Sequence, residues 1–253
     1  MPRNSNWSYL LTTGPSAPRL SVVNTFAPVA RSSVATAVFE QILAQILDGS
    51  LDPGSVLPSE RALTAELGVT RQVIREALQR LDQLGLVEIR HGGSTRVRDY
   101  RDAAGLDLLP RLFRRADGSL DAEVVRSVME MRQAVGADAA ALCALRLADT
   151  AGLRRAVAAA AGRGHELESV FWDLVVEGSQ NICYRLSLNA LRQAYAPAAA
   201  LVAEVLTGEL GAVERYEEVI AAIEARDPER ARAAAAVLLS IGTAAITAFL
   251  EGP

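Results

Sequence analysis

The sequence contains no lysine, so all 26 of its basic residues are arginines. Mechanisms that form a Schiff base on a lysine are therefore excluded. Histidine is almost as scarce, because only His91 and His165 occur in 253 residues. His165 is not part of a His-Glu-x-x-His zinc motif, and the sequence has neither a Gly-x-Ser-x-Gly nucleophile turn nor a glycine-rich phosphate loop. We therefore expect the protein not to be an enzyme.

Cysteine is rare as well. Cys143 and Cys183 lie far apart in apolar stretches with helical character, which predicts two buried, reduced thiols. No apolar run is long enough to cross a bilayer without interruption, and the alanine-rich C-terminal stretch is typical of a packed helix. Residues 1–30 carry no cleavable signal pattern, and we interpret them as a flexible N-terminal arm. These absences favour a cytoplasmic protein without a membrane partner.

The sequence does contain a pair of short helical patterns joined by a tight turn. Ser59 is a typical N-cap for the first helix, and Leu63 and Leu67 lie four residues apart on one face of it. Gly68 follows at the position where a left-handed residue commonly ends a helix. Thr70 is placed to cap the second helix. The pattern predicts a helix-turn-helix.

The second of these helices separates apolar from polar residues. Its expected buried stripe consists of Val73, Ile74, Ala77, Leu78 and Leu81. Arg71, Gln72 and Arg75 fall outside this stripe, where a helix in the major groove contacts base edges. Arginine can pair with guanine and glutamine with adenine, and each good pair discriminates by about 1–3 kcal/mol. The alternative is that these are solvated polar residues on an ordinary helical hairpin.

A hairpin pattern follows the second helix. Residues 86–90 and 95–98 alternate between apolar and polar residues, as half-buried strands do. The segment between them contains His91 and Gly92, and its glycines suit a turn. A small tip lets the backbone approach DNA, with Arg96 and His91 near phosphate or the minor groove. Helix-turn-helix and hairpin together predict a winged helix, with an exposed turn histidine as the alternative for His91.

The overall charge does not by itself indicate nucleic-acid binding, because the formal net charge is −4. Positive charge must therefore be concentrated locally, on the second helix and the hairpin. This distribution predicts modest non-specific affinity for DNA and a role in reading sequence rather than in coating DNA.

Beyond residue 100 the alternating pattern disappears. Residues 100–119 hold two glycines and a proline, and we expect a linker with one short helix. The helices expected after it cover residues 120–146, 149–162, 166–177, 182–206, 209–226 and 227–251. Asp227 and Pro228 provide a cap followed by proline at the first helical position. The predicted fold class is mainly α: a winged helix-turn-helix over residues 31–99 and an antiparallel bundle of six or seven helices over residues 120–253.

Residues 33–98 resemble the N-terminal DNA-binding domain of the GntR family of bacterial transcription regulators. The resemblance is carried by residues 51–61, 69–78 and 84–87 and by His91 and Gly92. It implies a sequence-specific regulator, nucleoid-associated when bound to DNA, that works as a homodimer on palindromic operators, with repression as the expected mode. The residues that it places at DNA are Arg61, Thr70, Arg71, Gln72, Arg75, His91 and Gly92, to which the hairpin pattern adds Arg96.

The second half is similar to the all-helical effector domain of the FadR-type branch of that family. The similarity rests on Met131, Arg132, residues 171–181 and residues 227–231. Many members hold a divalent metal with one aspartate and three histidines, but this chain has no histidine after residue 165. Trp172, Tyr216 and Leu238 stand in the corresponding segments, so we expect no metal and no other cofactor. A site made only of carboxylates, from Asp173, Glu177 and Glu217, is the alternative.

Aromatic and apolar residues in place of histidines favour a lipid-like effector. Residues 181–189 are also similar to fatty-acyl-responsive members of the branch, so we expect a fatty acid or a fatty acyl-CoA. The candidate ligand-binding residues are Arg132, Trp172, Asn181, Tyr184 and Tyr216. Three alternatives stay open: a small organic acid as effector, a ligand-free bundle that serves only dimerisation, and plain core packing of the aromatic residues.

Arg132 interrupts the apolar pattern of the first bundle helix. The residues expected to point inward around it are Val124, Val128, Met131, Val135 and Leu142. A buried arginine needs an anionic partner, either a ligand or an acidic residue such as Asp173 or Glu177. Ligand binding is expected to shift the linker and change the spacing of two DNA-binding heads, so that affinity for DNA falls or rises.

Overall fold

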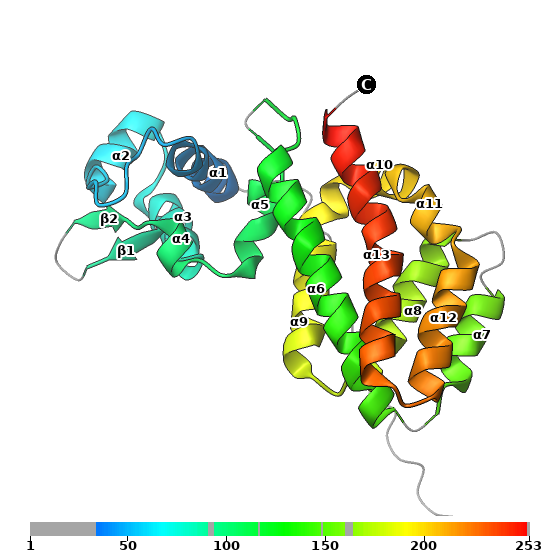
Figure 1. The fold of residues 1–253 in the computed structure, drawn as a ribbon. Helices are drawn as coiled ribbons and strands as arrows, with labels where there is room; N and C mark the ends of the chain where they lie inside the picture. Colours follow the sequence, from blue (N-terminus) through cyan, green and yellow to red (C-terminus); the bar gives the residue numbers. More distant parts are fainter. Residues whose placement is uncertain (1–33, 91–93, 116, 148, 160–163, 252–253) are drawn as a thin grey trace, which may run out of the picture. The chain divides into compact units, whose positions relative to one another are not determined.

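The computed structural model of the protein describes residues 34–90, 94–115, 117–147, 149–159 and 164–251 (Figure 1). The expected N-terminal arm and the predicted DNA contacts His91 and Gly92 lie outside these residues. Within them the fold is mainly helical, with one antiparallel sheet of two strands. The predicted fold class, a winged helix-turn-helix followed by a helical bundle, is confirmed.

The N-terminal domain has the order helix, helix, helix, strand, strand. Its elements are α1 (Val34–Leu47), α2 (Glu60–Leu67), α3 (Arg71–Gln83), β1 (Val87–Ile89) and β2 (Thr95–Val97). The strands pair in register with Glu88 opposite Arg96. Phe39 of α1 and Ile74 of α3 are fully buried in the core, and the guanidinium of Arg80 lies 4.3 Å from the centre of the Phe39 ring. Four of the five predicted inward residues of α3 are buried, and Val73 is half-buried.

The segment between the domains is more structured than a linker with one short helix. It contains α4 (Tyr100–Ala103), the 3₁₀ turn η1 (Leu106–Leu108) and α5 (Leu109–Leu112). Leu108 belongs to the core of the winged helix, and Phe113 belongs to the apolar core at one end of the bundle. Gly85, at φ +74°, is required beside α4, because a Cβ there would lie 2.5 Å from the carbonyl oxygen of Ala103. Side chains of this segment therefore take part in both cores.

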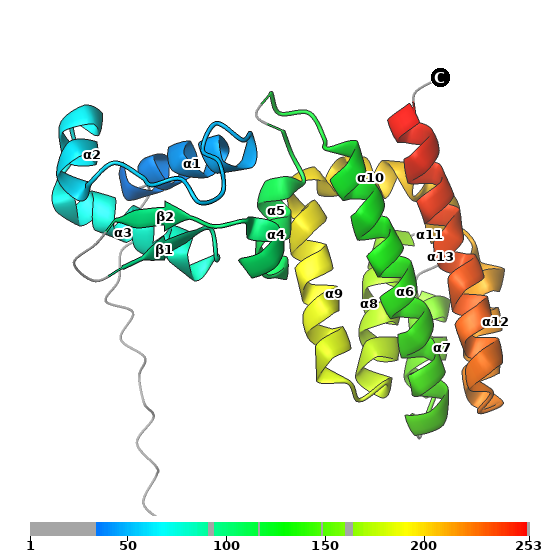
Figure 2. The same ribbon diagram turned by 60° about the vertical axis from the view of Figure 1, so that its left-hand side comes forward.

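Among the residues that the structure describes, the bundle contains six helices of nine or more residues and three short ones. The longer helices are α6 (Ala122–Arg146), α7 (Ala151–Ala159), α8 (Gly164–Gly178), α9 (Ile182–Tyr195), α12 (Val213–Glu224) and α13 (Pro228–Glu251). The short ones are η2 (Ala196–Ala198), α10 (Ala199–Val205) and α11 (Thr207–Leu210). Both ribbon views show α9 beside α6 (Figures 1 and 2).

Two predicted helices are broken in the structure. The stretch expected to form one helix over 182–206 divides into α9, η2 and α10, because Pro197 lacks an N–H and cannot continue α9. The stretch expected to start at residue 209 divides into α11 and α12, with Gly211 at the break. The resulting short helices α10 and α11 form a segment, residues 199–210, that we call the strap.

The inward face of α6 is not the predicted one. Val128 is buried as expected, but Val124, Met131, Val135 and Leu142 are only half-buried. The residues buried on α6 are Val125, Val128, Met129, Arg132, Gly136, Ala137, Ala139, Ala140, Ala141, Cys143 and Ala144. Small residues occupy this face because α13 packs closely against it. A Cβ on Gly136 would lie 2.5 Å from Cδ1 of Leu239. Side-chain size, rather than hydrophobicity alone, decides which residues face α13.

The two cysteines differ in exposure, so the prediction of two buried thiols is wrong for one of them. Cys143 is buried on α6, and burial raises the pKa of its thiol to about 12. Cys183 is exposed in the first turn of α9. The apolar neighbours of Cys183 in the sequence do not surround its side chain, because a helix places successive residues on different faces.

The last helix, α13, is the only one among the described residues that is long and apolar enough to cross a membrane by length and composition. Six of its residues are buried in the bundle, among them Ala235, Leu239 and Ile246. Its 24 residues run beside α6 (Figure 1). The helix packs one face against α6 and α12.

Candidate nucleic-acid interface and bundle site

Local side-chain chemistry builds the helix-turn-helix as the sequence predicts. Ser59 caps α2, and its Oγ accepts a hydrogen bond from the amide of Ala62 at 3.2 Å. Gly68 ends α2 in the left-handed conformation at φ 64°. Thr70 caps α3, and its Oγ1 accepts from the amide of Val73 at 3.5 Å. These caps set where α3 begins and therefore which side chains its first turn presents.

The first turns of α3 present three exposed polar side chains, Arg71, Gln72 and Arg75. Arg61 is exposed on α2. Nε of Arg75 lies 2.9 Å from Oε2 of Glu60, and the Arg75 side chain remains 64% exposed. Such an exposed ion pair is weak and readily exchanged, so the guanidinium can turn to a base or a phosphate. Sequence reasoning missed Glu60 as a partner, because the pair forms only when the turn brings α2 and α3 together.

The hairpin contributes one described candidate, Arg96 on β2. Its side chain is exposed, and Nη1 donates to the carbonyl oxygen of Gly54 at 2.9 Å. A single bridge between Val56 and Arg96 joins the same loop to the edge of β2. The guanidinium is therefore held near the base of the hairpin. The arginine nearer the turn, Arg90, pairs with Glu88.

In the bundle, Arg132 is almost fully buried and carries two carboxylate partners. Nη1 of Arg132 donates to Oε2 of Glu209 at 3.0 Å, and Nη2 donates to Oε1 of Glu209 at 2.5 Å. Nη2 also lies 3.2 Å from Oε1 of Glu168. The predicted partners Asp173 and Glu177 are wrong. Asp173 instead pairs with Arg192 at 2.9 Å. The sequence gives no signal for Glu209, which lies 77 residues from Arg132 and comes from α11.

This ion cluster, Arg132 with Glu168 and Glu209, combines one positive and two negative charges when all three residues are ionised. Burial raises the pKa of the Glu209 carboxyl more than the attraction of Arg132 lowers it. Burial alone would lower the pKa of Arg132, but the charges and hydrogen bonds of Glu209 and Glu168 together outweigh burial and raise this pKa. The backbone of Gly242 makes room for the carboxylate, because a Cβ there would lie 2.1 Å from Oε2 of Glu209.

Three aromatic side chains pack next to the ion cluster. The ring of Phe171 meets Trp172 edge-on at 5.3 Å and Tyr216 edge-on at 4.9 Å. Nε1 of Trp172 and the hydroxyl of Tyr216 are buried, and neither has a hydrogen-bond partner among the described residues. A cavity of about 20 Å³ is lined by Arg132, Glu168 and Trp172 among others. Its volume suits a single water molecule rather than an acyl chain.

The five candidate ligand residues do not form one site. Arg132 and Trp172 line the same cavity, and Tyr216 packs beside them through Phe171. Asn181 caps α9, its Oδ1 accepting from the amide of Cys183 at 3.0 Å. Tyr184 donates its hydroxyl to Asp138, which also pairs with Arg232. Asn181 and Tyr184 therefore do not line the cavity that Arg132 and Trp172 share, and the role of the five residues in ligand binding stays a prediction.

The residues near the cluster do not fit a divalent metal. Trp172 offers only an N–H donor and Leu238 has no donor atom, while Glu168 is already bound to Arg132. The carboxylates of Asp173, Glu177 and Glu217 do not meet, since the first two pair with Arg185 and the third with Arg154. No group of three or more possible metal ligands occurs among the described residues.

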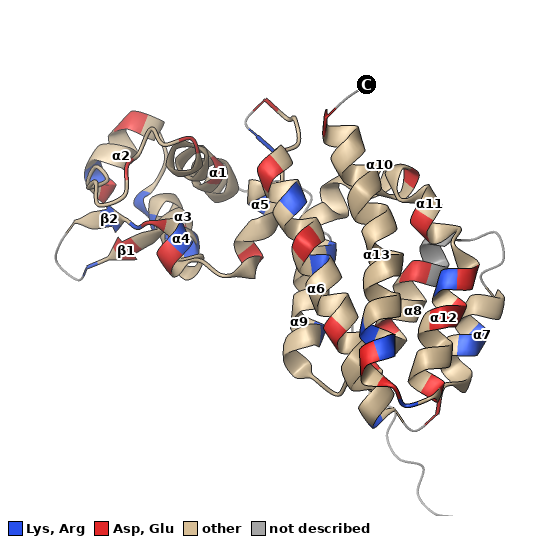
Figure 3. Cartoon of the chain, in the orientation of Figure 1, with Lys and Arg blue, Asp and Glu red and all other residues tan. Residues whose placement is uncertain are grey.

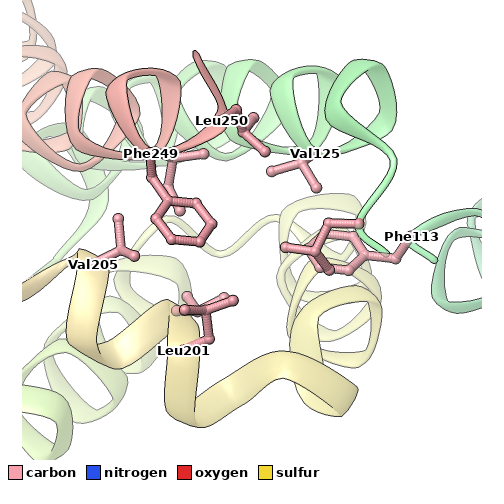
Figure 4. Close-up of a pocket in the computed structure, with 9 residues that line it drawn as sticks. Phe113, Val125, Leu201, Val205, Phe249 and Leu250 are labelled. Carbon is pink, nitrogen blue, oxygen red and sulfur yellow. The ribbon is translucent and has the colours of Figure 1, made fainter. Parts of the chain in front are cut away.

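A second pocket lies where α6, α10 and α13 meet (Figure 4). Nine apolar residues line it, among them Phe113, Val125, Leu201, Val205, Phe249 and Leu250. Figure 4 shows Phe249 of α13 facing Leu201 and Val205 of α10. Phe249 is 47% exposed as a whole residue. The sequence pattern gives no signal that α10 covers Phe249, because the contact joins segments more than 40 residues apart.

Comparison with known proteins supports the assignment of both domains. Residues 34–97 match the family model for bacterial regulatory proteins of the gntR family, and residues 127–240 match the model of the FCD domain. The HTH-type transcriptional regulator Mce2R of Mycobacterium tuberculosis is 42% identical over 234 residues, which cover 88% of this chain and 95% of that protein.

Two other similarities are narrower. The fatty acid metabolism regulator protein of Vibrio cholerae is 42% identical over 89 residues, 35% of this chain and 30% of that protein. The solved structure of Streptococcus agalactiae GntR covers 83% of this chain and 99% of its own, with 23% identity and a TM-score of 0.43. The helix-turn-helix geometry, the two family models and the Mycobacterium relative together show that the chain belongs to the GntR family of bacterial transcription regulators, in the FadR-like branch with a C-terminal FCD domain.

Proposed function

We propose that this transcription regulator reads a palindromic operator through the first turns of α3, acting as a repressor in the cytoplasm. The carrying observation is the exposed group Arg71, Gln72 and Arg75 on a helix whose start is fixed by the Thr70 cap. Arg61, Arg96, His91 and Gly92 supply further contacts to DNA. The proposal assigns the chain no catalytic reaction and no metal or other cofactor.

The effector is proposed to be a fatty acid or a fatty acyl-CoA bound in the helical bundle. The Vibrio cholerae relative is named a fatty acid metabolism regulator protein, and its match covers 35% of this chain. That name supports a lipid-like effector. The apolar pocket below α10 supports it in this chain, because its lining is entirely hydrocarbon and includes Phe113 at the end of the inter-domain segment. A ligand there can bias the linker and the DNA-binding heads.

A titration of operator DNA by mobility shift tests this proposal. The protein is freed of lipid, and the affinity for its operator is measured with and without dodecanoic acid and dodecanoyl-CoA. We expect a change in affinity of about 5- to 150-fold with an effector, the range of typical allosteric couplings. Unchanged affinity at saturating concentrations of both ligands contradicts lipid control and leaves two alternatives, a small organic acid as effector and a ligand-free dimerisation bundle.

The proposed homodimer has a suitable surface on α13. No charged residue occurs between Arg232 and Glu251, and Figure 3 shows α13 uncharged along its middle. Ala233, Val237, Ser240, Ala244 and Ala248 are exposed, and only 28% of the apolar window of this helix is buried inside the chain. A helix that is apolar on all sides normally has every side covered. Small side chains let the same helix of a second copy approach closely.

Placing charge on this face is expected to separate the dimer. The double variant Val237→Glu, Ala244→Glu should sediment as a monomer at concentrations where the wild type is dimeric. Two buried, unpaired carboxylates per copy would strongly disfavour association. Ala158→Glu, at an exposed position of α7, is the matched control and should remain dimeric. A dimer that survives the double substitution shows that α13 is not the interface.

A further inference from the structure

The apolar pocket and the ion cluster lie on the same face of α6. Val125 lines the pocket and Arg132 forms the cluster. They lie seven positions apart, which is two helical turns and about 10 Å along the axis. Met129, between them on this face, is also buried. An apolar seam with a cation at one end therefore runs along α6.

The facing side of this seam is formed by α13 and the strap. Ile246 of α13 lines the apolar pocket, and Gly242, one turn earlier, lies against the carboxylate of Glu209. A Cβ on Gly242 would also lie 2.7 Å from Cδ2 of Leu206 in the strap. The same three elements therefore enclose both the pocket and the cluster.

The strap closes the seam but is anchored by few side chains. No residue of α10 is buried, although Leu201, Val202 and Val205 cover the pocket. The buried side chains of the strap are Leu206, Glu209 and Leu210. Glu209 is the only charged residue among them, and its carboxylate forms two hydrogen bonds with Arg132. With the strap in place the pocket has a volume of about 10 Å³, which is too small for an acyl chain.

We propose that this seam binds an aliphatic carboxylic acid, whose carboxylate replaces that of Glu209 on Arg132 and whose chain lies beneath α10. The inference rests on the proposed lipid control and narrows the effector from a fatty acid or fatty acyl-CoA to the free acid. Exchange of one carboxylate for another leaves the charge of the buried cluster unchanged, so the main electrostatic cost of burial is not added again. The carboxylate of Glu209 becomes hydrated when it is released from Arg132, and the hydrocarbon chain of the ligand is transferred out of water.

The unpaired polar atoms beside the cluster support a ligand with oxygen acceptors. Trp172 lines the cavity together with Arg132, and its Nε1, which can only donate, is buried and has no hydrogen-bond partner within the described part of the chain. A carboxylate has about four acceptor positions, of which Arg132 uses two. A ligand carboxylate that sits further into this cavity than Glu209 can accept from Trp172 as well. This additional hydrogen bond gives a free acid an advantage over the internal glutamate.

The strap offers a matched pair of carboxylates for the test. Glu209 is fully buried on Arg132, whereas Glu204 is exposed on α10. Calorimetric titration of the full-length, lipid-free protein compares dodecanoic acid, dodecan-1-ol and dodecanoyl-CoA. We expect Glu209→Gln to bind dodecanoic acid about tenfold or more tightly than the wild type, because the internal competitor is gone. Glu204→Gln should match the wild type, and dodecan-1-ol should not gain from Glu209→Gln.

Chain length provides a readout in the wild type itself. Across a series of saturated acids, affinity should rise about fourfold for each methylene added until the seam is filled. Hydrogen exchange of residues 199–210 should increase when the acid binds, since Glu209 no longer anchors them. The inference is overturned if Glu209→Gln leaves the affinity for dodecanoic acid unchanged, or if the alcohol binds wild type as tightly as the acid.

Failure of the proposed function has a different signature. If dodecanoic acid binds with these properties but operator affinity does not change, the site stands and lipid control fails. If dodecanoyl-CoA alone changes operator affinity, and Glu209→Gln does not affect acid binding, lipid control stands and this site is wrong.

Discussion

Replacing both Arg71 and Arg75 by alanine is expected to lower operator affinity by about 30-fold to 10⁴-fold. Each arginine can donate two hydrogen bonds to a guanine, worth about 1–3 kcal/mol per pair, and 1.4 kcal/mol corresponds to tenfold. If one arginine contacts phosphate instead, the dependence of log affinity on log salt should become less steep by about one unit. Mobility shift at several salt concentrations measures both quantities.

The same double variant should keep its fold. Both side chains are exposed, and the Arg75–Glu60 pair is too solvated to add much stability. Arg215→Ala, which removes an exposed arginine of α12, is the control and should bind the operator as the wild type does. The assignment of DNA reading to α3 is refuted if the Arg71, Arg75 double variant binds the operator within about twofold of the wild-type affinity, as the control is expected to do.

Replacing Arg132 by methionine is expected to destabilise the bundle by about 3–5 kcal/mol. Removal of one partner from a buried ion pair leaves uncompensated charge, here on Glu209 and Glu168. For a protein of this size the midpoint of thermal unfolding should fall by about 6–20 °C. Arg154→Met, which removes an arginine that is 50% exposed and bound to two carboxylates, is the control and should shift the midpoint far less.

The pH dependence of Arg132→Met identifies the cause of its instability. Burial already raises the pKa of Glu209, and loss of Arg132 raises it further. A carboxyl with a raised folded-state pKa favours the folded protein at low pH, and that contribution is lost as pH rises through this pKa. The loss of stability in Arg132→Met should therefore be smaller near pH 5 than near pH 8. A deficit that does not vary with pH indicates lost packing rather than orphaned charge.

Charge removal at all three positions of the cluster separates these explanations further. Arg132→Met combined with Glu168→Gln and Glu209→Gln leaves no buried ion, so we expect it to regain much of the stability lost in Arg132→Met alone. Differential scanning calorimetry of both variants measures the difference. Equal midpoints for the two variants are incompatible with uncompensated charge as the main cost.

Much of the DNA-reading surface was predictable from the sequence, because short-range interactions define it. Ser59, Gly68 and Thr70 each act within four residues along the chain, as caps or as a left-handed turn residue. With the start of α3 fixed, helical periodicity alone places Arg71 and Arg75 outside the buried stripe. No distant part of the chain is needed to decide this.

The bundle site was not predictable in the same way. Helical periodicity indicated that Arg132 needed an anion, but not that Glu209 would supply it from α11. The face of α6 was misassigned because Gly136 and the alanines near it are weak hydrophobic signals, yet they are the residues that let α13 approach.

The sequence by itself determined the two-domain class, the helix caps, the exposed arginines of α3 and the need for an anion at Arg132, because these follow from local periodicity, capping and the charge of single residues. Only the tertiary structure decided which carboxylate meets Arg132, and that α10 covers an apolar pocket. It also decided that Trp172 and Tyr216 are core neighbours, whereas Asn181 caps α9 and the Tyr184 hydroxyl binds Asp138. The physical reason is that these contacts join segments far apart in the chain, where the choice among chemically equivalent partners depends on close packing of whole helices.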